Sequence, residues 1–429
     1  MTDYTRLDEK ELRKELDQLN EIYDQIKSQN LKLDMSRGKP CSEQLALSVD
    51  MLKYPDPTDN FITSDGVDAR NYGLVDGIAE AKELFAEILE VDSKNIIVGN
   101  NSSLSMMYDT IARAMQFGLY GSKTPWSKLP KVKFLCPSPG YDRHFAITEL
   151  FGFEMIVVDM LKDGPDMEKV EKLVAEDPFI KGIWCIPKYS NPTGITFSDE
   201  VVDALAKMKT AAEDFRIFWD NAYVVHHLTD TPDRLKNLLS ACYEAGNPDR
   251  ALIFTSTSKI TFPGAGIACM AASENNIAHT KKLTGFRTIG PDKMNQLRHV
   301  RFLKNAKGVE EHMKKHARIL KPKFDQVFNI LSAQLKDKNI AEWTEPKGGY
   351  FISFNTMPGC AKAVVKMAAE AGVVFTPAGA TFPYGKDPLD RNIRIAPTLP
   401  PINELKTAME LFCICVRIVS IKKLLGELN

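Results

Sequence analysis

Short apolar runs alternate with helical segments through the middle of the chain. Seven mostly apolar runs are predicted to be strands: residues 96–98, 132–136, 155–158, 183–186, 217–219, 252–255 and 268–271. Segments between them, such as 79–90 and 200–213, carry apolar residues at helical spacing. Strands that are apolar on both faces and separated by helices are typical of parallel sheets. The pattern predicts an α/β fold with a mixed, mostly parallel seven-stranded sheet sandwiched by helices.

The pattern differs at the two ends of the chain. Near the start, apolar residues recur at alternating spacings of four and three, which predicts one face of a helix: Leu12, Leu16, Leu19, Tyr23 and Ile26. After residue 307, a long charged helical segment precedes a strand-rich region and a closing helix at 405–416. We expect a small α+β domain from residues 1–50 and 307–429, and a large domain from residues 51–306.

Composition and charge narrow the function classes. A net charge of -1 with 44% hydrophobic residues is typical of a globular protein and disfavours electrostatic nucleic-acid binding. The N-terminus is polar and the chain has no apolar stretch long enough to span a bilayer, so we expect a cytoplasmic protein without membrane partners. The eight cysteines include no Cys-x-x-Cys pair, which favours buried free thiols over disulfides or metal ligands.

A lysine stands shortly after one predicted strand. Lys259 closes the segment Thr-Ser-Thr-Ser-Lys, and Gly264 and Gly266 follow it. Hydroxyls and bare backbone N–H groups bind phosphate dianions, and a lysine amine of lowered pKa can hold an aldehyde covalently. Taken alone, Lys259 is equally well explained as a surface lysine.

Other polar residues stand at strand ends and turns. Asp220 follows the predicted strand 217–219, at the end where parallel sheets present catalytic groups, and Tyr223 comes three residues later. Asn191 opens the turn Asn-Pro-Thr-Gly. Arg394 lies between two isoleucines, and a guanidinium buried there would need an anion such as a carboxylate. Individually, the aspartate also suits a helix cap and the asparagine a plain turn.

Taken together and in this order, these segments resemble the active-site set of the fold type I pyridoxal-phosphate (PLP) aminotransferases. The resemblance is to the aspartate aminotransferase superfamily, in the subgroup related to MocR-type catalytic domains, and spans about residues 33–397. It implies a homodimer with shared active sites and PLP as cofactor. It also implies a ping-pong exchange of an amino group between an amino acid and a 2-oxo acid.

The resemblance implies roles around the cofactor ring. Lys259 would bind the cofactor aldehyde and shuttle a proton between the substrate Cα and the cofactor. Asp220 would keep the pyridine nitrogen protonated, while Tyr223 and Asn191 would hydrogen-bond the phenolic oxygen.

Further residues are implied to hold the ring face and the phosphate. Tyr141 would stack on the ring and His144 would orient the aspartate, although a structural role explains His144 equally well. The phosphate would be bound mainly by hydroxyls: Ser102, Ser103, Ser256, Ser258 and, from the neighbouring subunit, Tyr72.

The substrate residues follow from the same resemblance. Arg394 would grip the α-carboxylate, with Asn191, Gly38 and Arg37 beside it. Aspartate or glutamate is the favoured donor, with 2-oxoglutarate as acceptor, and several arginines are available for a second carboxylate: Arg37, Arg143, Arg287 and Arg298. Three alternatives stay open: a carbon-sulfur lyase, an aminotransferase for neutral or aromatic amino acids, and a PLP-sensing regulatory domain. The regulatory domain is disfavoured because about 30 residues before the catalytic part are too few for a DNA-binding domain.

Two features depart from a simple assignment. Most relatives carry a phosphate-binding arginine seven or eight residues after the lysine, where this chain has Gly266 and Ile267, so either another cation such as Lys293 or hydroxyls alone bind the phosphate. His312 and His316 have a spacing that could bind a metal, but their charged neighbours predict a solvated helix face and no metal site.

Overall fold

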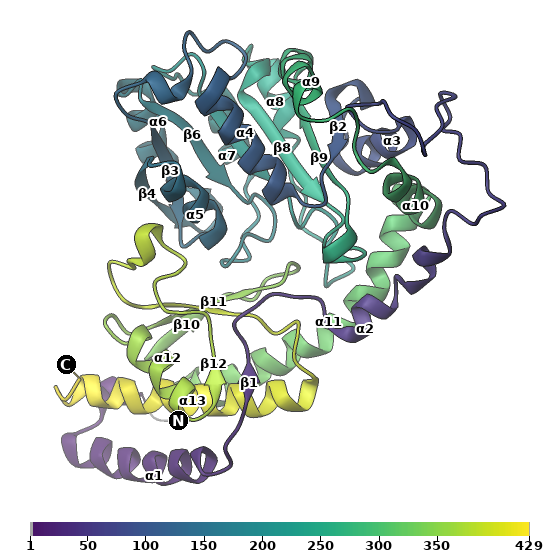
Figure 1. Cartoon of the computed structure of the whole chain (residues 1–429). Helices are drawn as coiled ribbons and strands as arrows, with labels where there is room; N and C mark the ends of the chain where they lie inside the picture. Colours follow the sequence, from purple (N-terminus) through teal and green to yellow (C-terminus); the bar gives the residue numbers. More distant parts are fainter. Residues whose placement is uncertain (1–2, 429) are drawn as a thin grey trace.

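The computed structural model describes residues 3–428 and is built around an eight-stranded sheet. Figure 1 shows this sheet with helices packed around it. The strands lie in the order β2-β9-β8-β7-β6-β3-β4-β5. Their bounds are β2 (Ile96–Gly99), β3 (Lys133–Ser138), β4 (Glu154–Leu161), β5 (Gly164–Pro165), β6 (Ile180–Cys185), β7 (Arg216–Asp220), β8 (Ala251–Ser256) and β9 (Ala268–Ala272). β9 is antiparallel to both neighbours and β5 to β4, while the other neighbouring pairs are parallel.

The predicted mixed, mostly parallel sheet and its seven strands are confirmed. The eighth strand, β5, was missed because its two residues, Gly164 and Pro165, are too few to show any alternation. It pairs with the end of β4 at the edge of the sheet.

Helices cover both faces of this sheet, as predicted. One face packs against α4 (Ser103–Phe117), α5 (Asp142–Leu150) and α9 (Glu274–Arg287). The other packs against α3 (Ala79–Leu89), α6 (Met167–Glu176), α7 (Asp199–Lys207), α8 (Leu238–Glu244) and α10 (Lys293–Leu303). Neighbouring strand residues enter opposite cores: Phe218 of β7 lies on the α4 side, and Ile217 and Trp219 lie on the α3 side. This alternation explains why the strands are apolar on both faces.

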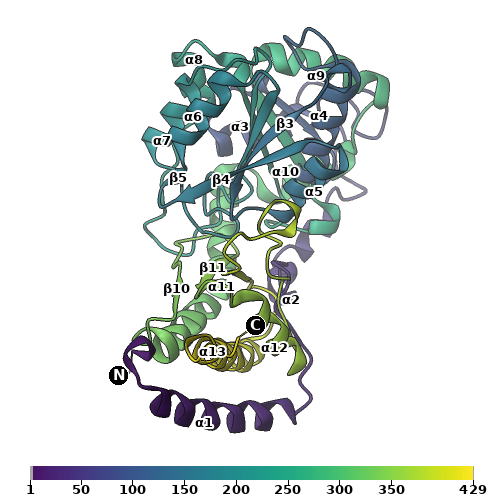
Figure 2. The same ribbon diagram turned by 90° about the vertical axis from the view of Figure 1, so that its left-hand side faces the viewer.

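The two ends of the chain meet in a second layered part below the large sheet (Figure 2). It contains a three-stranded antiparallel sheet of β10 (Ala341–Trp343), β11 (Ile352–Thr356) and β13 (Asn392–Ile395). A parallel pair joins β1 (Leu33–Asp34) to β12 (Val373–Val374). Its helices are α1 (Glu9–Lys27), α12 (Ala361–Glu370) and α13 (Ile402–Leu424). The N- and C-terminal segments therefore share one core, and the exact division at residues 50 and 306 stays a prediction.

The predicted N-terminal helix is present as α1. A capping box between Asp8 and Glu11 starts it, and its apolar face packs against α13. Of the five predicted apolar positions four are buried, and Ile26 is partly buried. No helix within residues 3–428 is both long and apolar enough to cross a membrane.

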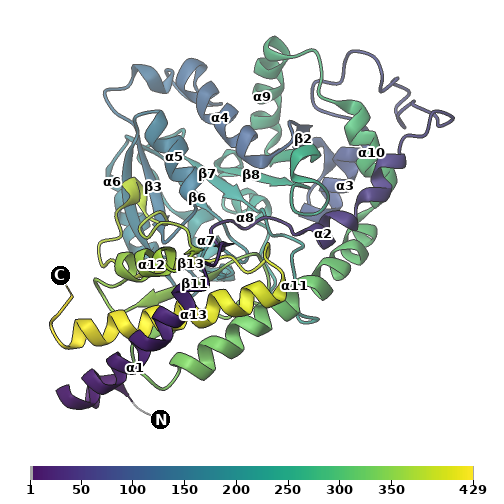
Figure 3. The same ribbon diagram turned by 60° about the horizontal axis from the view of Figure 1, so that its bottom comes forward.

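The long helix α11 (Ala306–Leu335) connects the two parts (Figure 3). The predicted solvated face of this helix at His312 and His316 is wrong, because both side chains are buried against the segment that contains α2 (Ser42–Ala46). Gln44 Nε2 lies 3.0 Å from His316 Nδ1, and Ser48 Oγ lies 3.2 Å from His312 Nε2. Charged neighbours in sequence did not reveal this contact because α2 lies more than 260 residues away along the chain.

Candidate active site

A cavity of about 650 Å³ opens at the carboxyl ends of the parallel strands, facing the small three-stranded sheet. Residues that follow β2, β3, β6, β7 and β8 line one side, and residues around β1, β11, β12 and β13 line the other. The structure brings together these predicted site residues: Arg37, Gly38, Ser102, Ser103, Tyr141, Asn191, Asp220, Tyr223, Ser256, Ser258, Lys259 and Arg394. His144 lies behind the lining, and Tyr72 lies outside the cavity.

Lys259 stands three residues after the end of β8 and places its amine beside two stacked aromatic rings, whose centres lie 6.0 Å apart. Its Nζ lies 5.2 Å from the centre of the Tyr223 ring and 5.8 Å from that of Tyr350. Desolvation lowers the pKa of Lys259, and the charge of Asp220 opposes this shift. A lysine with a lowered pKa has more of the neutral amine that attacks an aldehyde. Tyr350 was not predicted, and only the adjacent Gly348-Gly349 pair hinted at an unusual segment.

Asp220 ends β7 and is 3% exposed. Its Oδ2 lies 3.0 Å from Nε2 of His144, whose ring stacks on Trp184 with centres 4.5 Å apart. Its Oδ1 is buried and has no hydrogen-bond partner within residues 3–428. An unpaired buried carboxylate oxygen is unfavourable, so a ligand N–H at this place would be strongly bound. The oriented aspartate therefore fits a protonated pyridine nitrogen.

Two tyrosines offer hydroxyls and ring faces close to this aspartate. Tyr141 caps the start of α5, and its ring meets that of His144 edge-on at 5.0 Å. Burial, aided by the charge of Asp220, raises the pKa of Tyr141 to about 12. Burial also raises the pKa of Tyr223 well above its usual value. Both hydroxyls are thus protonated at neutral pH and available as hydrogen-bond donors.

The predicted phosphate side combines a helix start with clustered hydroxyls. Ser102 caps α4, and Ser256 Oγ lies 3.0 Å from Ser258 Oγ. Ser258 also donates to the backbone oxygen of Asn101 at 3.4 Å, which joins the two segments. Backbone N–H groups at the start of a long helix attract anions. This edge of the cavity therefore suits a phosphate group.

The structure explains why no arginine stands seven or eight residues after Lys259. A Cβ on Gly266 would lie 3.0 Å from the backbone oxygen of Asn101 and 3.3 Å from the backbone nitrogen of Ser258, so any side chain here would require this backbone to shift. Ile267 is 2% exposed and belongs to the core of the large sheet. The alternative cation, Lys293, donates to the backbone oxygen of Gly73 at 3.0 Å and does not line the cavity.

Arg394 of β13 lies at the opposite side of the cavity. Its guanidinium contacts Asp142 Oδ1 at 2.8 Å and Asn191 Oδ1 at 3.3 Å, and its central carbon lies 4.9 Å from the centre of the Phe351 ring. Phe351 also explains why residue 38 is a glycine, because a Cβ at this position would lie 2.3 Å from the Phe351 ring. The contacts to Asp142 and Phe351 could not be predicted, because each joins segments more than 40 residues apart.

The four arginines considered for a second carboxylate fall into two groups. Arg37 and Arg143 line the cavity. Arg287 lies outside it, within 3.3 Å of Asp109, and Arg298 donates to the backbone oxygen of Tyr54 at 2.9 Å. Within this chain, only the first pair faces the cavity.

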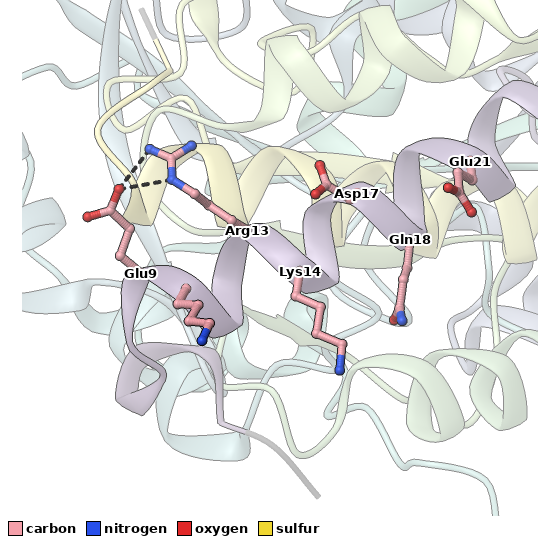
Figure 4. A pocket seen from close by; sticks show the side chains of 7 residues that line it. Glu9, Arg13, Lys14, Asp17, Gln18 and Glu21 are labelled. Atoms are coloured by element: carbon pink, nitrogen blue, oxygen red, sulfur yellow. Dashed lines mark hydrogen bonds and ion pairs between the residues drawn. The ribbon is translucent and has the colours of Figure 1, made fainter.

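A second hollow lies on the outer face of α1 and has a different character (Figure 4). One helix supplies all its lining residues, and Arg13 is already paired with Glu9 at 2.8 Å. Its charged side chains do not converge on a common point, as the close view shows. It has the features of a solvated helix face rather than of a binding site.

Comparisons with known proteins agree with this geometry. A family model described as aspartate amino-transferase matches residues 7–428. The chain is 50% identical to a putative aminotransferase from Mycolicibacterium smegmatis, with 96% of each chain covered. It is 48% identical to an aspartate aminotransferase from Corynebacterium glutamicum, covering 92% of this chain and 91% of that protein. A crystal structure of an aspartate transaminase from the same organism superposes with a TM-score of 0.96, at 45% identity and 99% coverage of both chains.

Proposed function

Because this chain belongs to the aspartate aminotransferase family and is an aminotransferase, we propose that it uses PLP to move an amino group from aspartate or glutamate to a 2-oxo acid such as 2-oxoglutarate. One observation carries the proposal: a single cavity holds the amine of Lys259, an oriented carboxylate with an unpaired oxygen, and Arg394. These groups match the aldehyde, the ring nitrogen and the substrate carboxylate that such a reaction requires.

The residues of the cavity fit PLP at both of its ends. Asp220 Oδ1 would accept a hydrogen bond from the ring nitrogen, and Tyr141 and Tyr223 would lie by the ring. The start of α4 with Ser102, and the hydroxyls at the end of β8, would hold the phosphate. When bound, PLP supplies an aldehyde for amines and a ring that accepts the electron pair released at the substrate Cα.

The chain's own groups would bind and orient the substrate and move its proton. Arg394 would bind the α-carboxylate, which fixes the Cα–H bond relative to Lys259. The lowered pKa of Lys259 favours the neutral amine that removes this proton. His144, held by Trp184, would keep Asp220 in place throughout the reaction.

The preference for aspartate or glutamate is supported by the cations of the cavity. Arg37 and Arg143 lie on its lining and could bind a second carboxylate. The Corynebacterium relative is itself an aspartate aminotransferase. Both arginines are exposed in the single chain, and a neutral substrate side chain could not form the ion pair that a second carboxylate forms with them.

A half-reaction screen tests the substrate. The PLP-loaded protein is mixed with each amino acid in turn, and conversion of the cofactor to its amino form is followed by absorbance. We expect aspartate and glutamate to react faster than alanine or phenylalanine, and 2-oxoglutarate to reverse the change. Faster reaction with neutral or aromatic amino acids would refute the proposed preference for aspartate or glutamate. Release of ammonia with the product would favour a lyase.

We also propose that the working unit is a homodimer with shared active sites. Tyr72, on the long segment that extends away from the body between η2 (Val49–Lys53) and α3, is 79% exposed (Figure 1). Phe286 and Ile289 are 84% and 62% exposed, and the neighbouring Gly290 lies close to the backbone of Gly73. Large exposed apolar side chains suit burial against another chain. In this arrangement Tyr72 would reach the partner's phosphate site.

We also propose that the protein is located in the cytoplasm. All eight cysteines are buried and none forms a disulfide. Burial raises the pKa of these thiols, Cys242 to about 12, so they are unreactive. Buried free thiols suit a reducing compartment.

A further inference from the structure

Arg394 already has a carboxylate partner inside the cavity. Asp142 Oδ1 lies 2.8 Å from one terminal nitrogen of the guanidinium. The other hydrogen bonds of Arg394 are longer and uncharged, at 3.3 Å to Asn191 Oδ1 and 3.4 Å to Thr376 Oγ1, and its Nε is buried without a partner among the described residues. Asp142 is therefore the strongest partner of this arginine in the absence of substrate.

The position of Asp142 keeps its carboxylate stabilised after it leaves the arginine. It is the first residue of α5, where the positive end of the helix stabilises a carboxylate. Its side chain is 34% exposed, whereas that of Arg394 is 7% exposed. After leaving Arg394, the carboxylate would keep both the helix start and water as partners.

The charges on the cavity lining single out the same residue. The lining holds five cationic side chains, which are Arg37, Lys39, Arg143, Lys259 and Arg394. Among the residues that the structure describes, its only carboxylates are Asp142 and Asp220. Asp220 is held by His144. Of these two lining carboxylates, Asp142 is therefore the one that an incoming anion can replace on a cation.

A substrate carboxylate and Asp142 compete for the same guanidinium. Bidentate binding of a carboxylate needs two parallel N–H groups, and Asp142 uses one terminal nitrogen. Two carboxylates on one guanidinium would also repel each other in this partly dry site. We propose, resting on the function proposed above, that Asp142 is a built-in competitor: it occupies Arg394 in the empty site and is displaced whenever a substrate carboxylate binds.

Competition by Asp142 affects how tightly substrates bind and not the rate of the chemical steps. Every amino acid and every 2-oxo acid displaces the same carboxylate, so the competitor weakens binding of donors and acceptors by a common factor. An effect that is equal in the bound substrate and in the transition state changes KM and leaves kcat nearly unchanged. A purely structural role of Asp142 would not produce this separation.

The test compares Asp142→Asn with the parent PLP-loaded enzyme. Glu149→Gln is the matched control, because it removes the same charge from the exposed face of the same helix. Binding of succinate, a carboxylate without an amino group, is measured by calorimetry, and KM and kcat are measured for aspartate and 2-oxoglutarate. We expect Asp142→Asn to tighten succinate about five- to thirtyfold and to lower both KM values by the same factor, whereas Glu149→Gln changes neither.

The other outcomes overturn the inference in distinguishable ways. Unchanged or weaker succinate binding by Asp142→Asn, in a variant with parental circular dichroism, would show that Asp142 supports Arg394 instead of competing for it. An equal change in Glu149→Gln would assign the effect to overall charge. A parent enzyme that binds succinate but transfers no amino group would refute the proposed function and leave the competition measurable. A parent that binds no carboxylate would refute both.

Discussion

Lys259 carries its amine beside the stacked rings of Tyr223 and Tyr350 rather than against a carboxylate. Asp220, whose charge favours the protonated amine, is bound instead to His144. Desolvation therefore outweighs attraction, and the pKa of Lys259 is lowered. The position of Lys259 thus affects both the activity and the free energy of unfolding, and each can be measured.

Replacement of Lys259 by alanine removes both the covalent link and the proton carrier. We expect transamination to fall by at least the contribution of general acid-base catalysis, about 10²–10⁴-fold, and the absorbance of lysine-bound cofactor to disappear. Lys282→Ala, on the exposed surface of α9, is the control and should keep both. A Lys259→Ala protein with parental absorbance and turnover would contradict the assignment.

The lowered pKa of Lys259 also predicts a pH dependence of stability. Below its folded-state pKa the lysine is charged in both states, so its burial penalty is fully present. As the pH rises toward the ordinary value of about 10.4, the unfolded state binds more protons than the folded state and the penalty is lost. In cofactor-free protein, the free energy of unfolding of the parent should therefore rise with pH relative to Lys259→Met.

Denaturant unfolding of both proteins at several pH values between neutrality and pH 10 gives this difference. A difference that is independent of pH would show that the folded-state pKa is not lowered. Lys259→Met also removes the lysine from beside Asp220. This changes the free energy of unfolding by a constant amount between neutrality and pH 10, so it does not produce a slope with pH.

At the scale of elements, α2 and α11 are joined by buried polar groups that contact the surroundings of Lys259. Gln44 is fully buried, and its Nε2 donates to Tyr350 Oη at 2.8 Å and lies 3.0 Å from His316 Nδ1. His312 Nε2 lies 2.9 Å from the backbone oxygen of Ile260, the residue after Lys259. The helix pair therefore supports both the ring beside the lysine and the backbone that carries it.

Gln44→Leu should break this connection while conserving most of the side-chain volume. Three buried groups, the hydroxyl of Tyr350, a nitrogen of His316 and the backbone N–H of Cys41, would lose their partner, at about 1–3 kcal/mol for each unsatisfied group. We expect the free energy of unfolding in urea to fall by an amount of this size. Gln18→Leu, on the exposed face of α1, is the control and should change it little. Equal stability of Gln44→Leu and the parent would show that these contacts contribute nothing net.

At the scale of the whole molecule, the proposed dimer places Tyr72 of one chain at the phosphate site of the other. A mixture of Lys259→Ala and Tyr72→Ala chains would then form hybrid dimers in which one of the two sites has both residues. Random exchange of equal amounts should restore about a quarter of the parental activity, since half of the dimers are hybrids with one intact site each.

Activity after mixing, compared with each variant alone, checks this arrangement, and sedimentation gives the oligomeric state. A mixture as inactive as its components, with exchange of chains verified, would show that Tyr72 acts within its own chain or not at all. An active monomer at assay concentration would refute the shared site.

Much of the fold was encoded locally and could be predicted from the sequence. Apolar runs bounded by helical segments determined the seven longer strands, because strands buried on both faces admit few polar residues. Lys259 and Asn191 follow β8 and β6, Asp220 ends β7, and all three line one cavity, since parallel strands bring their carboxyl ends to one edge of the sheet. Apolar periodicity is a property of residues that are neighbours in the sequence.

What only the tertiary structure decided depends on contacts between distant segments. The burial of His312 and His316, the closure of the backbone around Gly266, and the pairing of Asp142 with Arg394 each require groups far apart in the chain. Their side chains carry no local sign of these partners: a charged helix face and an acidic first turn are ordinary surface features. Whether such a residue is solvated, structural or competes with substrate is determined by what folds against it, and that is a property of packing rather than of sequence pattern.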